Sequence, residues 1–171
     1  YQLESVQRAI ADMGAEAILA DEVGLGKTIE AGVIACELHA RRLVETVLLA
    51  VPAALLEQWQ AELRDKFSIE AHIVEGTDAP LPQWALISHH RLRMREYQPL
   101  INSRFWDLVI VDEAQVLRND RTLLYKTVYS LHRRHILLLT ATPLQNDLFE
   151  LFHLIHLVRP GFLRSKRYFA R

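Results

Sequence analysis

The chain has 171 residues, half of them apolar, which is enough to bury one sizeable core, so we expect a single domain. Its 20 Lys and Arg residues nearly balance 21 Asp and Glu residues, so the bulk charge gives no indication of a nucleic-acid partner, which must be inferred from local sites. The single cysteine, Cys36, excludes a disulfide bond within the chain and indicates a reducing compartment and a buried structural thiol.

Short apolar runs alternate along the chain with longer segments that have helical spacing. The first predicted strand, 17–20, precedes a glycine-bearing loop and a predicted helix at 27–42. The later predicted strands are 47–51, 69–74, 84–88, 108–111 and 136–139, and the later helices are 53–66 and 147–158, the last with Asn146 as its N-cap. This alternation is typical of the α/β class, in which helices cover both faces of a mostly parallel sheet.

A glycine-containing loop follows the first predicted strand, where residues 21–28 read Asp-Glu-Val-Gly-Leu-Gly-Lys-Thr. The glycines allow a tight turn, so that backbone N–H groups around Gly24, Leu25 and Gly26 can hold phosphate oxygens at the start of the helix. Lys27 can reach the β and γ phosphates, and the Thr28 hydroxyl can bind Mg²⁺. The alternative is an ordinary glycine turn with an exposed lysine.

An acidic pair ends the predicted strand 108–111, in the sequence Asp112-Glu113-Ala114-Gln115. Ligands of open α/β sheets bind at the carboxyl ends of the strands, which is where both carboxylates should lie. Asp112 is suited to holding Mg²⁺, and Glu113 to polarising the water that attacks the γ phosphate. The alternative is an acidic helix N-terminus. The sequence contains no Asn-Lys-x-Asp guanine-reading segment, which favours adenine as the base.

Three segments together, 21–32, 112–115 and Leu-Thr-Ala-Thr-Pro-Leu-Gln-Asn at 139–146, closely resemble the Snf-type (sucrose non-fermenting) ATPases of helicase superfamily two. Within that family the chain is most similar to the bacterial and archaeal branch that includes the RNA-polymerase-recycling translocase. The resemblance implies a RecA-like P-loop NTPase lobe. It also implies that the strand leading into Thr140 lies between the phosphate-loop strand and the Asp112 strand.

The same resemblance implies roles for residues outside the phosphate loop. Gln2 matches a glutamine that reads adenine, although an ordinary polar helix residue is the alternative. Thr140 and Thr142 match a motif that couples nucleotide state to the nucleic-acid track, and Gln115 is placed to relay between the γ phosphate and these threonines. The positions implied to contact nucleic acid are Pro52, Ala53 and Ser88. We assign Trp59 to the hydrophobic core.

The function implied is ATP hydrolysis with Mg²⁺, stimulated by double-stranded DNA and used to displace or remodel RNA polymerase or another DNA-bound protein. We expect a fragment of a longer chain, 1–171 being the ATP-binding lobe, whose second lobe donates arginines to the transferring phosphoryl group. No apolar run reaches the roughly 18 residues that span a bilayer, so we expect a cytoplasmic, nucleoid-associated protein. The rival functions are a helicase that separates strands of RNA or single-stranded DNA, and a non-enzymatic docking lobe.

Overall fold

A six-stranded parallel sheet forms the centre of the computed structural model, which describes residues 16–20, 26–141 and 148–163. Its strands are β1 (Glu16–Ala20), β2 (Val47–Val51), β3 (His72–Ile73), β4 (Trp84–Ser88), β5 (Trp106–Val111) and β6 (Arg133–Thr140). They lie in the order β1-β6-β5-β2-β4-β3. The strand that leads into Thr140 therefore lies between the phosphate-loop strand and the Asp112 strand, as the resemblance predicts.

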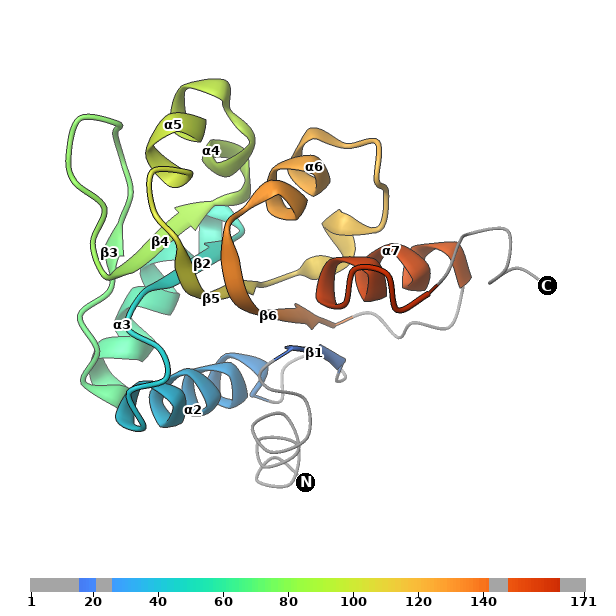
Figure 1. Ribbon diagram of the computed structural model, residues 1–171. Helices are drawn as coiled ribbons and strands as arrows, with labels where there is room; N and C mark the ends of the chain where they lie inside the picture. The colour runs from blue at the N-terminus through green and yellow to red at the C-terminus, as the bar shows by residue number, and fades with distance from the viewer. Residues whose placement is uncertain (1–15, 21–25, 142–147, 164–171) are drawn as a thin grey trace.

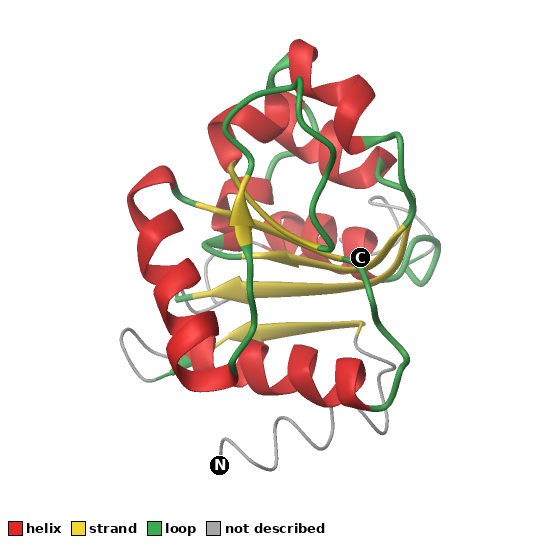
Figure 2. Ribbon diagram, turned by 90° about the vertical axis from the view of Figure 1, so that its left-hand side faces the viewer, coloured by secondary structure: helices red, strands yellow, loops and turns green. Residues whose placement is uncertain are grey.

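Helices cover both faces of this sheet (Figure 1), and in Figure 2 the strands run side by side between them. The helices α2 (Lys27–Ala40) and α3 (Leu56–Phe67) pack on one face, and α4 (His89–Arg93), α5 (Gln98–Ile101), α6 (Leu123–Ser130) and α7 (Leu148–Val158) pack on the other. Strand residues alternate between the two cores: Leu49 and Ile110 belong to the first, Leu48 and Val109 to the second. Because both faces are buried, the strands are continuous apolar runs, and the predicted α/β class is confirmed.

Some predicted boundaries differ from the observed ones, and the predicted strand 69–74 is wrong in extent. The N–H groups of Ser68 and Ile69 bond back to the carbonyl oxygens of Arg64 and Leu63, which closes α3 and leaves only His72 and Ile73 in β3. The predicted helix 27–42 ends at Ala40. Helices α4, α5 and α6 were not predicted, and Asn146, the predicted N-cap of α7, lies outside the described residues.

The Asp107 carboxylate ties the start of β5 to the start of β2. Its Oδ2 accepts the N–H groups of Glu45 and Thr46 at 2.9 and 3.0 Å and the Thr46 hydroxyl at 3.1 Å. Burial acts to raise the pKa of Asp107, but these hydrogen bonds and the Arg134 guanidinium outweigh it, so the pKa lies below its usual value. The charged form is therefore the one that the fold stabilises.

We expect Asp107→Asn to lower the free energy of unfolding at pH 7 by about 1 to 2 kcal/mol, because hydrogen bonds to a charged acceptor are replaced by weaker ones. The pKa of Asp107 is lower in the folded than in the unfolded chain. Its contribution is therefore complete above the unfolded pKa of about 3.9 and is lost as the pH falls through the folded pKa. Urea unfolding of both variants at pH 7 and near pH 3 measures this difference. If the difference in free energy of unfolding between the two variants is as large near pH 3 as at pH 7, the stabilising role of the Asp107 carboxylate is contradicted.

Helices α2 and α3 approach closely at Gly32. A Cβ atom added at this glycine would lie 2.5 Å from Cε2 and 2.7 Å from Cζ of Phe67, the last residue of α3. Real Cβ atoms do not pack at such distances, so the ring of Phe67 occupies space that only a glycine leaves open. The end of α3 can therefore lie against the middle of α2.

Cys36 and the lengths of the helices were also subjects of expectations from the sequence. The sequence predicted a buried thiol at Cys36, but the residue is only half-buried on α2. This partial burial raises the pKa of its thiol to about 11, so the group stays protonated at neutral pH. Within the described ranges, every helix is too short or too polar to traverse a bilayer.

Candidate functional site

Gly26 is the first described residue of the phosphate loop, and Gly24, Leu25 and Gln2 lie outside the described residues. Gly26 has φ 98°, in the left-handed region that favours glycine, and its carbonyl accepts the N–H of Glu30 at 2.8 Å to begin α2. Lys27 and Thr28 follow as the first two helical residues, and both are half-buried. The sequence-predicted cation and hydroxyl therefore lie together at the N-terminus of α2.

The acidic pair follows β5 directly. The N–H of Asp112 donates to the Ala50 carbonyl at 2.9 Å, so Asp112 extends the pairing of β5 with β2, and its side chain is buried. Glu113 has φ 50° and ψ 48°, a left-handed conformation that is uncommon for a residue other than glycine, and its N–H donates to Asp112 Oδ1 at 2.8 Å. This turn ends the strand, so the Glu113 side chain is no longer directed by the alternation of a pleated strand.

The indole of Trp59 holds the other oxygen of the same carboxylate. Trp59 Nε1 donates to Asp112 Oδ2 at 2.9 Å, and the side chain is 1% exposed. The sequence assigns Trp59 to the core, which is correct, but the hydrogen bond was not predicted. A buried indole N–H needs an acceptor, and that requirement was the available signal.

Gln115 lies between Glu113 and Thr140, where the resemblance predicts a relay. Its amide donates to the Glu113 carboxylate, and its Oε1 accepts the Thr140 hydroxyl at 3.0 Å. Thr140 is fully buried at the end of β6, and Thr142 lies outside the described residues. A continuous line of hydrogen bonds thus joins the carboxyl ends of β5 and β6.

A hollow of about 320 Å³ opens at this edge of the sheet. Its walls include Gly26, Lys27, Thr28, Asp112 and Glu113. The phosphate-loop lysine and the acidic pair therefore face one space that is within the size range of small-ligand sites. The Asp112 carboxylate and the Thr28 hydroxyl are hard oxygen donors, the kind that Mg²⁺ prefers, and Lys27 supplies a positive charge for phosphate. This donor set fits a magnesium nucleotide.

Another wall of the same hollow is formed by Leu55, at the end of the turn before α3, and by Gln58, Glu62 and Lys66 of α3. Glu62 accepts hydrogen bonds from the Gln58 amide at 3.0 Å and from Lys66 Nζ at 3.1 Å. These polar groups of α3 are therefore paired with one another.

The predicted nucleic-acid positions lie at the carboxyl ends of β2 and β4, where Val51 pairs with Ser88. Pro52 is half-buried and Ala53 is exposed at the turn that precedes α3. Ser88 is 4% exposed, and its Oγ accepts the N–H of Arg91 at 3.2 Å as the N-cap of α4. The contact of all three with nucleic acid stays a prediction.

His89 lies next to the acidic pair and was not predicted as a site residue. Its Nε2 is 3.1 Å from the Ala50 carbonyl oxygen. Burial lowers the pKa of His89, against the opposing effect of its hydrogen bond to the Ala50 carbonyl and of the Asp112 and Glu113 carboxylates. The neutral imidazole is therefore favoured, and it contacts the end of β2 through the Ala50 carbonyl.

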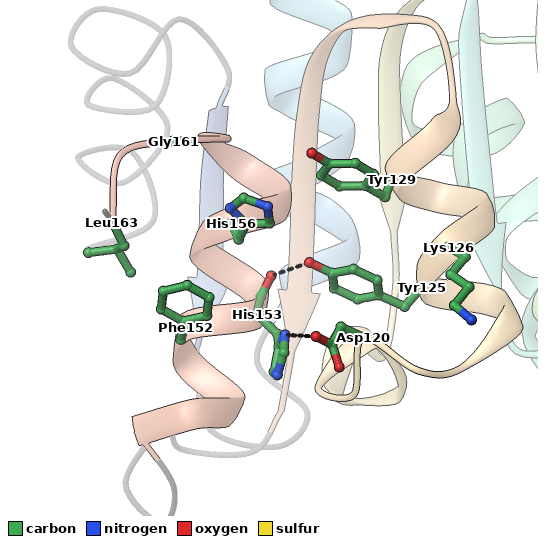
Figure 3. A pocket seen from close by; sticks show the side chains of 9 residues that line it. All are labelled: Asp120, Tyr125, Lys126, Tyr129, Phe152, His153, His156, Gly161 and Leu163. Atoms are coloured by element: carbon green, nitrogen blue, oxygen red, sulfur yellow. Dashed lines mark hydrogen bonds and ion pairs between the residues drawn. The ribbon is translucent and has the colours of Figure 1, made fainter. Parts of the chain in front are cut away.

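A larger hollow of about 460 Å³ lies between α6 and α7 (Figure 3). The rings of Tyr129 and Phe152 stack on His156 with centroids 5.4 and 5.9 Å apart, and the Tyr125 hydroxyl donates to the His153 carbonyl at 3.4 Å. Aromatic pairs at such distances are stabilising, so we interpret this cluster as the packing of α6 on α7. Lys27 and Asp112 line the other hollow, which we take as the candidate site.

Comparison with known proteins identifies the family. A family model described as SNF2-related domain matches residues 1–171. The protein named "Uncharacterized ATP-dependent helicase YqhH" of Bacillus subtilis is 41% identical over 175 residues, which cover 99% of this chain and 30% of that protein. Chromodomain-helicase-DNA-binding protein 1 of Homo sapiens is 33% identical over 164 residues, which cover 86% of this chain and 10% of that protein. The chain thus spans less than a third of the length of these relatives.

Solved structures show the same fold. The SWI2/SNF2 ATPase core of Sulfolobus solfataricus in complex with dsDNA superposes with a TM-score of 0.86 at 24% identity, covering 99% of this chain and 37% of that one. The SWI2/SNF2 ATPase core domain of the same organism gives a TM-score of 0.82. The predicted RecA-like lobe is therefore confirmed as a fold, and, since the family model matches from the first residue to the last, the chain belongs to the SNF2-related domain family.

Proposed function

We propose that this chain is the ATP-binding lobe of a motor that hydrolyses ATP, moves along double-stranded DNA and displaces or remodels proteins bound there. The observation that carries the proposal is the shared hollow into which Lys27, Thr28, Asp112 and Glu113 all face. Family membership supports it, as do the name of the Bacillus subtilis relative, an ATP-dependent helicase, and the Sulfolobus solfataricus core in complex with dsDNA.

In this proposal each side chain of the hollow has one task. Lys27 binds the β and γ phosphate oxygens, and Thr28 and Asp112 hold the metal ion. Bound Mg²⁺ would neutralise the negative charge that develops on the phosphate oxygens. Glu113 accepts the proton of the attacking water, and the Gln115 amide keeps its carboxylate in place. Recognition of the adenine base is assigned to the glutamine near the start of the chain, as the resemblance implies.

Coupling to DNA is assigned to the hydrogen-bonded line from Glu113 through Gln115 to Thr140. A change at the γ phosphate would shift the Glu113 carboxylate and, with it, the Gln115 amide that donates to it. Gln115 would transmit this shift to the end of β6, because its Oε1 accepts the Thr140 hydroxyl at 3.0 Å. The residues that follow Thr140 belong to the motif that the resemblance links to the nucleic-acid track. Pro52 and Ala53 are the proposed backbone contacts to a DNA strand.

A second lobe of the same chain completes the proposed motor. The hollow is open, and phosphoryl transfer needs cations on the far side of the γ phosphate, which arginines of another lobe would supply. The relatives are more than three times as long as the matched segment, which leaves room for such a lobe. We propose RNA polymerase or another DNA-bound protein as the displaced partner, and action on DNA in the cytoplasm, at the nucleoid.

The decisive experiment compares the ATPase rate of the full-length protein with duplex DNA, single-stranded DNA and RNA. We expect duplex DNA to give the largest stimulation, and we expect ATP-dependent release of a triplex-forming third strand while the duplex stays paired. Stronger stimulation by single strands together with duplex separation would favour a strand-separating helicase instead. A rate that no nucleic acid changes would favour a docking lobe.

A further inference from the structure

Both carboxylate oxygens of Asp112 are held by hydrogen-bond donors that come from different parts of the fold. The backbone N–H of Glu113 donates to Oδ1 at 2.8 Å, and the indole Nε1 of Trp59 donates to Oδ2 at 2.9 Å. The first donor is local, since it comes from the next residue in the chain. The second comes from α3, 53 positions away in the sequence, so it fixes the carboxylate relative to another element.

The indole is rigidly placed for this bond. Trp59 is 1% exposed and packs in the core between α3 and the sheet, where close packing restricts the motion of its ring. Asp112 is 7% exposed, so the bond is shielded from competing water. A carboxylate held by two donors keeps its remaining lone pairs aimed in a fixed direction, which here is toward the hollow that Lys27 and Thr28 also line.

We infer that Trp59 is a positioning residue that orients the Asp112 carboxylate for its metal ion and fixes it to α3. The inference rests on the proposed function, which makes Asp112 a metal-holding group. Groups that hydrogen-bond to metal-binding carboxylates tune the affinity for the ion, and their loss commonly costs roughly 10- to 100-fold in metal affinity or activity. Packing alone does not require the N–H, because a phenylalanine would fill most of the same space.

The chain offers a matched control in Trp106. This tryptophan is also fully buried, and its Nε1 donates to the Ile101 carbonyl at 3.1 Å, on the other face of the sheet. Trp59→Phe and Trp106→Phe therefore remove the same chemical group from equally buried positions. One removal affects the acidic pair, and the other does not.

The test uses the full-length protein with Mn²⁺ in place of Mg²⁺ and ADP as the nucleotide. Electron paramagnetic resonance of free Mn²⁺ gives the dissociation constant of the ion in the nucleotide complex. We expect this constant to rise about tenfold or more in Trp59→Phe and to stay at the wild-type value in Trp106→Phe. The Mg²⁺ concentration for half-maximal ATPase rate should rise by a similar factor, with kcat largely recovered at saturating Mg²⁺.

An unchanged Mn²⁺ constant in Trp59→Phe, or an equal rise in both variants, overturns the inference. If Trp59→Phe fails to fold by circular dichroism, replacement of the indole by benzothiophene removes the N–H while keeping the shape, and the same two outcomes apply to it. A wild-type protein that binds no Mn²⁺ with ADP would defeat the proposed function itself. If the wild-type protein binds Mn²⁺ with ADP and the Trp59 variant binds it equally tightly, only this inference is overturned.

Discussion

Glu113→Gln is expected to lower the kcat of DNA-stimulated ATP hydrolysis in the full-length protein by a factor of roughly 10² to 10⁴, the usual contribution of a general base. A glutamine has the size of the glutamate and can still accept the hydrogen bond that the Gln115 amide donates. It cannot take a proton from water. The dissociation constant for ATP should therefore stay near the wild-type value, and steady-state hydrolysis together with binding of a fluorescent ATP analogue measures both quantities.

The control for this change is Glu96→Gln, which alters an exposed glutamate in the short turn after α4. It removes the same charge from the protein without touching the hollow, so its kcat should match the wild type. Hydrolysis by Glu113→Gln at the wild-type rate would show that another group activates the water, and it would also favour the docking function.

Lys27→Ala is expected to raise the dissociation constant for ATP on the order of 100-fold, because the loss of one partner of a desolvated charge pair costs several kcal/mol. Lys27 is half-buried at the start of α2 and lines the same hollow as Asp112 and Glu113. Without its ammonium group, the phosphates would face two carboxylates with less compensation. Isothermal titration calorimetry of ATP into the full-length protein in saturating Mg²⁺ measures the change.

Lys126→Ala serves as the matched lysine variant. Lys126 is exposed on α6 and lines the hollow between α6 and α7 instead. Its removal changes the net charge equally and should leave the ATP dissociation constant unaltered. If the two variants bind ATP alike, the phosphates do not lie against α2, and the shared hollow is not the nucleotide site.

The strands of the sheet were predictable because each central strand is a continuous apolar run in the sequence. Residues 47–51 and 108–111 are apolar at every position, and only strands buried on both faces need such runs. The short helices α4 and α5 were missed because they have one or two turns each, too few for a periodic pattern. Strand order could not be derived from spacing alone; the family resemblance placed β6 between β1 and β5, and the order of the other strands was not predicted.

The candidate site was predictable where motifs are contiguous in the chain. Lys27 with Thr28 follow the loop after β1, and Asp112 with Glu113 follow β5 directly, so their common position follows from the parallel sheet. The contacts of Trp59 and His89 were not predicted because their partners, Asp112 and the Ala50 carbonyl, are distant in sequence. A contact between α3 and the end of β5 depends on how the helix packs on the sheet. The periodicity of residues within one helix does not predict such a contact.

The missing side chain at Gly32 allows close approach of α2 and α3, the two helices that line the hollow containing Lys27 and Asp112. Because the ring of Phe67 lies where a Cβ would be, the C-terminal end of α3 is drawn against α2, and with it Glu62 and Lys66 are held near the phosphate-loop side. A larger residue at this position would meet the Phe67 ring, so the ring or the helix that carries it would have to shift. The spacing of the two helices that line the hollow therefore depends in part on the absence of a side chain at Gly32, about one helical turn beyond Thr28.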